Sequence, residues 1–453
     1  MSPGPQRVTI RSPSRSIRVR APTRGSTIDA MEQTLDLASP AFLADVHGSL
    51  DRLRSQHFFA RAANGDGVFF NQADAAWVMR CVDFRFTFVE IDDQTSPYLA
   101  KAIQHELLNM HGEEHSRMRR LVSAGLRDRV EDELKDRIHA IADELIDALP
   151  NSGVVDLCRD FAEPLPGRVL GPMYGIPYDE AVDFNAWIRT GGRKLDALQS
   201  GEPIGEIEDA NRKMHDYLRE LLAERRTSLG TDIFSELIQA EVDGDRLTEE
   251  ELVYLATELA SAGVDTTRDQ LPLILLSLLT HPEQYDRLAK DPSLALAAVD
   301  EGMRYAPLPW VLPHTAVNDV HYKGIDFVEG DTVLILVPAT NRDPNVMDEP
   351  HRFDIDRPRA RNFSFGQAHT PARPHNLPAS KWRSLWNAWS REHRYSLPKN
   401  QHSPHRARAA SPPRSSPTSP STNEQITNRC QAPVRYRRYA IMAPSMTNSW
   451  PEQ

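Results

Sequence analysis

The chain has 453 residues and a formal net charge of −11, from 53 Lys and Arg residues against 64 Asp and Glu residues. Residues 1–28 lack the apolar run that a secretory signal or a membrane anchor of about 20 residues requires. The three cysteines, Cys81, Cys158 and Cys430, are far apart, which predicts neither a disulfide framework nor a zinc site. We therefore expect a cytoplasmic protein that works without a membrane.

Charge is unevenly distributed and divides the chain into three segments. Residues 368–453 carry 13 basic and 3 acidic residues among runs of Pro, Ser and Arg, and this composition predicts a disordered tail. Residues 1–30 are also basic and predict a disordered extension, with an organelle transit peptide as the alternative. The folded domain is expected over residues 31–367. A tail that binds nucleic acid is another possibility, but it contains no recognised nucleic-acid motif, so we expect no such partner.

The body of the chain is predicted to be mostly helical. Apolar residues recur at helical spacing over Glu113–Leu149 and again over Ala210–Arg226. Thr248 and Glu251 have the spacing of a capping box and open a long apolar helix that ends before His281.

Two features modify this helical pattern. Pro272 should kink or interrupt the long helix, because proline lacks a backbone donor and crowds the preceding turn. Residues Val320–Tyr322 and Thr332–Leu336 have strand composition, with glycines beside them. The predicted fold class is therefore mainly α, with a small β-sheet late in the chain.

The long helix contains the unusual sequence Ala262-Gly263-Val264-Asp265-Thr266-Thr267. Glycine and threonine each cost about 0.5–1 kcal/mol relative to alanine inside a helix. The Thr266 hydroxyl is expected to donate to the carbonyl of Ala262. If the helix bows at Gly263, a groove opens for a small ligand or water, and Asp265 can pass protons inward. The alternative is a polar helix face with a packing glycine.

A second candidate cluster lies further along the chain. Glu301 and Arg304 are three residues apart on a predicted helix and can form an ion pair. This spacing also occurs at Glu114 and Arg117, so the pair is informative only through its position before the strands and the later Arg352. A second guanidinium from Arg352 would complete a cluster that fixes an irregular loop.

Taken in order, these motifs resemble the cytochrome P450 family of haem-thiolate monooxygenases, in its soluble bacterial form. The resemblance extends from about residue 31 to Gln367, and the motifs that carry it are His115–Arg119, Ala262–Thr267, Glu301 with Arg304, Asn341–Pro344, Arg352-Phe353 and Phe365-Gly366. It implies a monomer that binds haem b and inserts one oxygen atom from O2 into a small organic substrate. Electrons would come from NAD(P)H through a ferredoxin reductase and a ferredoxin.

The resemblance also implies roles for individual residues. His115, Arg119 and His314 would bind the haem propionates, although a charged surface is the alternative for the first two. His314 stands where the family usually has arginine, and histidine gives a weaker contact because it is only partly charged at neutral pH. The other implied roles are a proton-delivering acid–alcohol pair (Asp265, Thr266), an oxygen groove (Ala262, Gly263) and a structural cluster (Glu301, Arg304, Arg352).

The resemblance ends abruptly after Gly366. The family pattern requires at position 372 a cysteine, whose thiolate is the axial iron ligand, but this chain has Ala372. Cys430 is not preceded by the Phe-x-x-Gly turn that the ligand loop requires. We therefore expect the chain as written to be inactive in normal monooxygenation.

A shifted reading frame offers an explanation. Suitable synonymous codons in that frame permit glycine at 368, histidine at 370, cysteine at 372 and Leu-Ala-Arg at 377–379, all at the family spacing. Our hypothesis is that one base was lost near codon 368, in the gene or in its reading. The competing interpretation is a non-catalytic pseudoenzyme or binding protein that keeps the helical body.

Overall fold

The computed structural model describes residues 34–87, 96–125, 131–150, 155–194, 197, 202–358 and 362–364, with the backbone alone for residues 131–135. The helices are α1 (Pro40–Ala44), α2 (Val46–Gln56), α3 (Gln72–Arg80), α4 (Pro97–Gln104), α5 (Gly112–Gly125), α6 (Glu131–Asp147), a π-helical turn (Cys158–Ala162), α7 (Pro164–Met173), α8 (Ala181–Gly191), α10 (Gly205–Thr227), α11 (Ile233–Gln239), α12 (Glu249–Thr280), α13 (Pro282–Lys290), a 3₁₀ turn (Pro292–Leu294), α14 (Ala295–Tyr305) and α15 (Val337–Thr340). The strands are β1 (Thr34–Leu35), β2 (Phe59–Ala62), β3 (Gly67–Phe69), β4 (Phe84–Phe86), β5 (Glu241–Val242), β6 (Asp245–Arg246), β7 (Val311–Ala316), β8 (Val320–Tyr322), β9 (Ile325–Phe327) and β10 (Thr332–Leu336). The predicted extension, residues 1–30, and the predicted tail, residues 368–453, lie outside the described residues.

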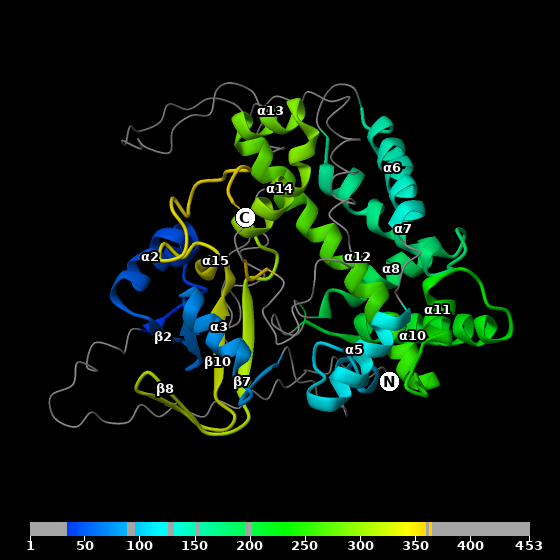
Figure 1. Ribbon diagram of the computed structural model, residues 1–453, viewed down its shortest axis with the longest axis horizontal. Coiled ribbons are helices and arrows are strands. Elements are labelled where there is room, and N and C mark those ends of the chain that lie inside the picture. The colour runs from blue at the N-terminus through cyan, green and yellow to red at the C-terminus, as the bar shows by residue number, and fades with distance from the viewer. Residues whose placement is uncertain are drawn as a thin grey trace, which may run out of the picture.

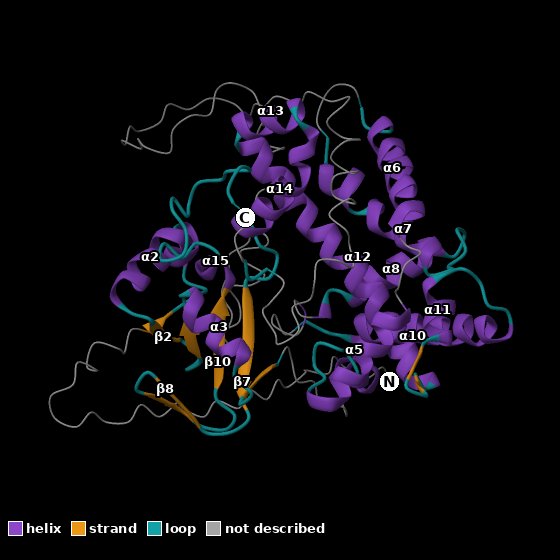
Figure 2. Ribbon diagram, in the orientation of Figure 1, coloured by secondary structure: helices purple, strands orange, loops and turns teal. Residues whose placement is uncertain are grey.

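The main sheet lies at one side of the molecule together with a few short helices, and most of the longer helices lie at the other side (Figures 1 and 2). The main sheet lies with α2, α3 and α15 on the left in Figure 1, while α5 to α8, α10 and α11 lie on the right. Helix α12 runs obliquely through the helical side and contributes residues to two hydrophobic clusters, one with α6, α7 and α14 and one with α5, α8, α10 and α11. The mainly α fold with a small sheet is thus confirmed, and α12 lies at its centre.

The main sheet draws on both ends of the described chain. Within the described residues its strand order is β1-β2-β3-β10-β7-β4. Strand β10 pairs in parallel with β3 and antiparallel with β7. The prediction that strands occur only late in the chain was therefore incomplete. Strands β1 to β4 have at most four residues each, too few to show alternation, and they are stabilised by pairing with neighbours distant in sequence.

Helix α12 begins and ends as the sequence predicts. Thr248 Oγ1 accepts a hydrogen bond from the Glu251 amide at 3.2 Å, and the Glu251 carboxylate accepts from the Thr248 amide at 2.8 Å, which completes the capping box. The helix continues through Pro272 to Thr280, so the expected interruption is absent. Buried leucine and isoleucine side chains on both sides of Pro272 keep these turns packed against α14.

The two earlier helix predictions also agree with the structure. Residues Ala210–Arg226 lie inside α10, and the predicted helix over Glu113–Leu149 corresponds to α5 and α6, with residues 126–130 outside the described residues. None of the described helices combines the length and the apolar character needed to cross a membrane.

Candidate functional site

Gly263 allows α7 to approach α12 closely. A Cβ atom at Gly263 would lie 2.7 Å from Leu170 Cδ1 and 3.1 Å from the Tyr174 hydroxyl, both closer than ordinary contacts. The Tyr174 hydroxyl donates to the carbonyl of Leu259 at 2.9 Å. Burial raises the pKa of Tyr174, which keeps this hydroxyl protonated as a donor. The glycine therefore has a packing role here, and the helix is continuous through it.

Thr266 makes the backbone contact that the sequence predicts. Its Oγ1 donates to the carbonyl oxygen of Ala262 at 2.6 Å. Thr257 and Ser277 make the same bond to the carbonyl four residues earlier, each at 2.8 Å. The bond therefore recurs at several hydroxyl residues of this helix and does not by itself mark a ligand site.

Asp265 is a buried acid whose charge is only partly compensated. Burial raises its pKa to about 6, and Asp269 adds to the rise, whereas Arg268 and Lys194 oppose it. The nearest guanidinium nitrogen of Arg268 lies 2.7 Å from Asp265 Oδ1, but Arg268 also pairs with Asp269. The carboxylate lies against Gly192 at the end of α8, where any Cβ atom would collide with it. A pKa of about 6 suits a group that exchanges protons near neutral pH.

The three residues expected to bind an anionic cofactor belong to one cluster of basic side chains, here called the basic cluster. His314 on β7 is buried, and burial lowers its pKa to about 4, with a further lowering by the positive charge of His111. The pKa of His115 is lowered by burial and then by Arg119, both on α5. The pKa of His111 is lowered by burial, Arg85 and His115.

The lowered pKa values leave these imidazoles largely uncharged at neutral pH. Among the described residues, each charged neighbour that shifts the pKa values of His111, His115 and His314 is a basic side chain. Such a cluster fits the carboxylates of a haem, whose negative charge would favour the protonated imidazoles. His111 and Arg85 were missed from the sequence. His111 stands four residues before His115, a spacing that could have indicated it.

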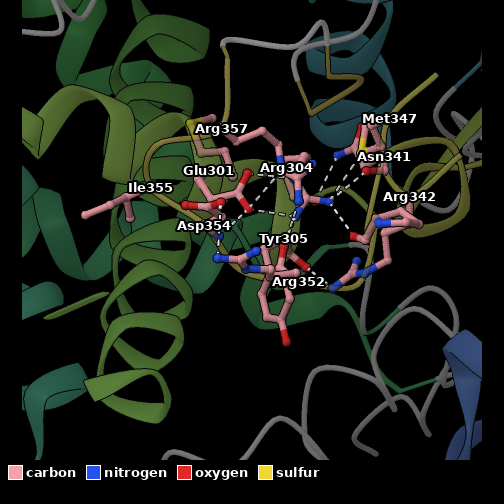
Figure 3. Close-up of polar contacts among 12 residues, drawn as sticks. Glu301, Arg304, Tyr305, Asn341, Arg342, Met347, Arg352, Asp354, Ile355 and Arg357 are labelled. Atoms are coloured by element: carbon pink, nitrogen blue, oxygen red, sulfur yellow. Dashed lines mark hydrogen bonds and ion pairs between the residues drawn. The ribbon is translucent and has the colours of Figure 1, made fainter. Parts of the chain in front are cut away.

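Glu301 and Arg304 on α14 form a buried bidentate ion pair (Figure 3). Arg304 Nε and Nη2 each lie 2.7 Å from a Glu301 carboxylate oxygen, and both side chains are at most 4 % exposed. Arg304 also donates to the carbonyls of Asn341, Pro350 and Arg352 at 2.8–3.1 Å. The pair thereby fixes the irregular segment that follows α15, as the sequence predicts.

The structure places a different arginine beside Glu301 from the one predicted. The Arg352 guanidinium pairs with Glu349 at 3.0 Å and is 55 % exposed, so Arg352 joins the cluster only through its main-chain carbonyl. Arg357 instead brings its Nε to 3.5 Å from Glu301 Oε1 and is 12 % exposed (Figure 3). Both arginines follow Pro350 closely in sequence, and the turn at residues 355–357 directs Arg357 toward Glu301.

Asn341 connects this cluster to the last described residues. Its Oδ1 accepts from the Phe363 amide at 2.7 Å, and its Nδ2 donates to Ser364 Oγ at 3.1 Å. Ser364 Oγ in turn donates to the carbonyl of Met303 at 2.8 Å. The chain is thus held up to Ser364. Phe365, Gly366 and Ala372 lie outside the described residues, as does the loop that would carry the axial ligand.

A mainly helical body with a small sheet and a cluster of basic side chains is consistent with a haem-binding protein, and similarity to known hydroxylases assigns the chain to the haem-dependent monooxygenases. The family model described as cytochrome P450 matches residues 200–371. The vitamin D(3) 25-hydroxylase of Pseudonocardia autotrophica is 33 % identical over 350 residues, or 73 % of this chain and 82 % of the relative. The cytochrome P450 monooxygenase PikC of Streptomyces venezuelae is 30 % identical over 77 % of this chain and 84 % of its own. The solved structure of P450BioI in complex with an acyl-carrier protein bearing hexadec-9Z-enoic acid superposes with a TM-score of 0.70 at 25 % identity, covering 77 % of this chain and 92 % of that one.

The chain belongs to the cytochrome P450 family, whose members bind haem and receive electrons from redox partners.

Proposed function

We propose that the body of this protein is built to insert one oxygen atom from O2 into a small organic substrate. The observation that carries the proposal is the basic cluster, in which His115, Arg119 and His314 would hold the propionates of haem b. His111 and Arg85 would strengthen the same site. Electrons would come from NAD(P)H through a ferredoxin reductase and a ferredoxin, and the protein would act as a cytoplasmic monomer. Cys81 forms no disulfide, which suits a reducing compartment.

On α12 the proposal assigns proton handling to Asp265 and Thr266. Haem bound through a thiolate supplies the chemistry that activates O2. Asp265, whose pKa is about 6, would hold a proton and release it toward the Thr266 hydroxyl. Leu170 and Tyr174 fill the space beside Gly263, so an oxygen groove at Ala262 and Gly263 would require these side chains to move away from α12. Glu301 and Arg304 would support the ligand loop without touching the reacting atoms.

The chain as written lacks the cysteine at position 372, and we propose that it is inactive for this reason. A lost base near codon 368 remains our explanation. Sequencing the genomic DNA across codons 360–385 tests it directly. An additional base with a cysteine codon at 372 would support the frameshift, whereas the same bases as the present reading would refute it.

A protein-level experiment tests the haem assignment. We would express the chain as written, a frame-restored chain, and the frame-restored chain with alanine kept at 372, and measure haem content and the spectroscopic signature of thiolate ligation. Only the restored chain should bind haem with that signature. A thiolate signature in the chain as written would contradict the proposal. In the restored chain, His115→Ala with Arg119→Ala should lower haem retention, and Arg159→Ala, an exposed arginine elsewhere, serves as the matched control.

A non-catalytic binding protein is the second candidate. It is favoured by the buried core and the Glu301–Arg304 network, which are complete within the described residues up to Ser364. If the chain as written unfolds cooperatively without haem, this candidate gains support. Aggregation or proteolysis of the chain as written would exclude it.

A further inference from the structure

One face of α12 carries polar side chains that contact α4 and the segment that follows it. Glu250, Tyr254 and Glu258 are spaced four residues apart, so they lie along one side of the helix. Lys101 Nζ lies 2.9 Å from Glu250, and the His105 ring stacks on Tyr254 with centroids 4.3 Å apart. One turn further along, the Leu107 amide donates to Glu258 Oε2 at 2.7 Å.

Two other helices fasten the same region through charged groups. Lys194, just after α8, forms an ion pair with Glu106, and these side chains are 19 % and 14 % exposed. Glu208 of α10 caps the start of α4 by accepting from the Tyr98 and Leu99 amides at 2.8 and 3.1 Å. Polar contacts therefore hold the start of the 105–110 segment between α8 and α12, while Met110, 7 % exposed, belongs to the apolar cluster of α12 and Leu107 packs against it.

Apolar packing around α4 is small by comparison. Leu99 and Ile103 of α4 belong to a separate cluster with Ala197, Ile204 and Ile207, and Leu108 is 58 % exposed. Segments with few buried apolar contacts open at a lower free-energy cost than the core. The hydrogen bond to Glu258 therefore acts beside the apolar contacts of Met110 and Leu107 in keeping the 105–110 segment against α12.

Glu258 is an unusual acceptor because it is a buried acid. Burial raises its pKa to about 7, with Glu106 adding to the rise, while the Leu107 and Leu108 amides and Lys194 oppose it. Glu106 from the segment and Lys194 after α8 are thus the ionisable groups that face it. Lys194 also acts on Asp265, two turns further along the same helix.

We propose that Glu258 is a positioning residue that docks the 105–110 segment onto α12, and that proton uptake by Glu258 tightens this dock. The segment is then released more often as the pH rises. The inference rests on the proposed function in one respect, because the dock controls access to a monooxygenase site only if α12 borders one.

The sign follows from the two states of the carboxyl group. In the docked state Glu258 binds its proton with a pKa of about 7, whereas an undocked, solvated glutamate has its ordinary lower pKa. Docking is therefore favoured as the pH falls through 7 and weakened above it. Between pH 8 and pH 6 this linkage predicts a roughly tenfold gain in docking.

Hydrogen–deuterium exchange of the full chain tests the proposal without requiring haem. After correction for intrinsic exchange rates, amides of the 105–110 segment should be roughly tenfold better protected at pH 6 than at pH 8. Glu258→Gln keeps an acceptor for the Leu107 amide and should retain protection but lose this pH dependence. Glu258→Leu removes the acceptor and should speed exchange by on the order of tenfold. Glu250→Gln, on the same face but exposed, is the matched control and should leave both properties of the 105–110 segment unchanged.

Peptides covering β10 report whether each variant still folds. If Glu258→Leu loses protection there too, the pH profile of Glu258→Gln decides the question. An unchanged pH dependence in Glu258→Gln overturns the proposal, as does unchanged protection in a folded Glu258→Leu. Failure of haem binding in the experiments above would refute the proposed function and leave this result intact.

Discussion

Glu301, buried on α14, differs from the partly buried Asp265 and Glu258 on α12 in how completely its negative charge is compensated by neighbouring groups. Glu301 on α14 accepts two guanidinium hydrogen bonds from Arg304 and one from the Asp354 amide. Asp265 on α12 shares its arginine with Asp269, and Glu258 faces a lysine already paired with Glu106. The pKa values of Asp265 and Glu258 consequently rise to about 6 and about 7.

The comparison distinguishes an acid that keeps a loop in place from acids that can exchange protons near neutral pH. A fully paired buried charge holds a loop in place and is costly to disrupt, because removing one partner leaves the other uncompensated. A partly paired buried acid exchanges protons near neutral pH, which is the property that proton delivery or a proton-linked dock requires.

The largest effect is expected from breaking the complete pair. Arg304→Ala should lower the free energy of unfolding by about 3–5 kcal/mol, because Glu301 is left buried without its partner. Urea denaturation followed by circular dichroism measures this. Arg159→Ala removes an exposed ion pair with Asp160 and should leave the free energy of unfolding nearly unchanged. Similar losses in the two variants would contradict the scaffold role.

The next largest loss of stability is expected from replacing Arg357, and a smaller one from replacing Arg352. Arg357 donates to the carbonyls of Asp348, Glu349 and Arg352 at 2.7–3.1 Å, so Arg357→Ala should cost about 1–3 kcal/mol. Arg352→Ala should change the free energy of unfolding much less, because its guanidinium is exposed. The same denaturation experiment compares them, and the reverse order would restore Arg352 as the inward-facing residue.

The raised pKa of Asp265 should be detectable in the pH dependence of the free energy of unfolding. Its pKa is raised on folding, so the native state binds the proton more tightly and stability is lost as the pH rises from about 4 through 6. Relative to Asp265→Asn, the unmodified protein should lose on the order of 1–3 kcal/mol between pH 4 and pH 7. Asp291→Asn supplies a control of opposite sign, because hydrogen bonds from Ser293 lower the pKa of Asp291. A flat difference for Asp265→Asn would show that this acid is not perturbed.

The smallest effect concerns the close approach of α7 to α12. Gly263→Ala gains about 1 kcal/mol of helix propensity but forces a contact with Leu170 and Tyr174, at about 1–3 kcal/mol. We expect a net loss of about 1 kcal/mol, measured by thermal or urea unfolding. At Gly205 an added Cβ meets nothing within 4 Å, so Gly205→Ala should leave stability unchanged or raise it. A stabilised Gly263→Ala would remove the packing role of this glycine.

Local sequence signals were sufficient for part of the fold and of the site. The Thr248–Glu251 capping box, the end of α12 before His281 and the Thr266 bond to Ala262 each depend on residues within four positions of one another. The Glu301–Arg304 pair is also local, since residues three apart on a helix face each other. The order of these motifs was enough to identify the family.

Contacts between distant residues could not be predicted in this way. Strands β1 to β4 form because they pair with β10, β7 and one another. Arg85 on β4 and His111 just before α5 join the basic cluster only through the tertiary fold. The inward turn of Arg357 depends on the path of the chain after Pro350. Pro272 was predicted to interrupt α12, but packing of the surrounding turns maintains the helix.

By itself the sequence determined the mainly α class, the P450 motifs and the alanine at position 372, because these depend on residue identity and short spacing. Only the tertiary structure decided which ionisable groups are buried together. Burial and charge pairing depend on surfaces brought from different helices, and they set the pKa values of Asp265 and Glu258.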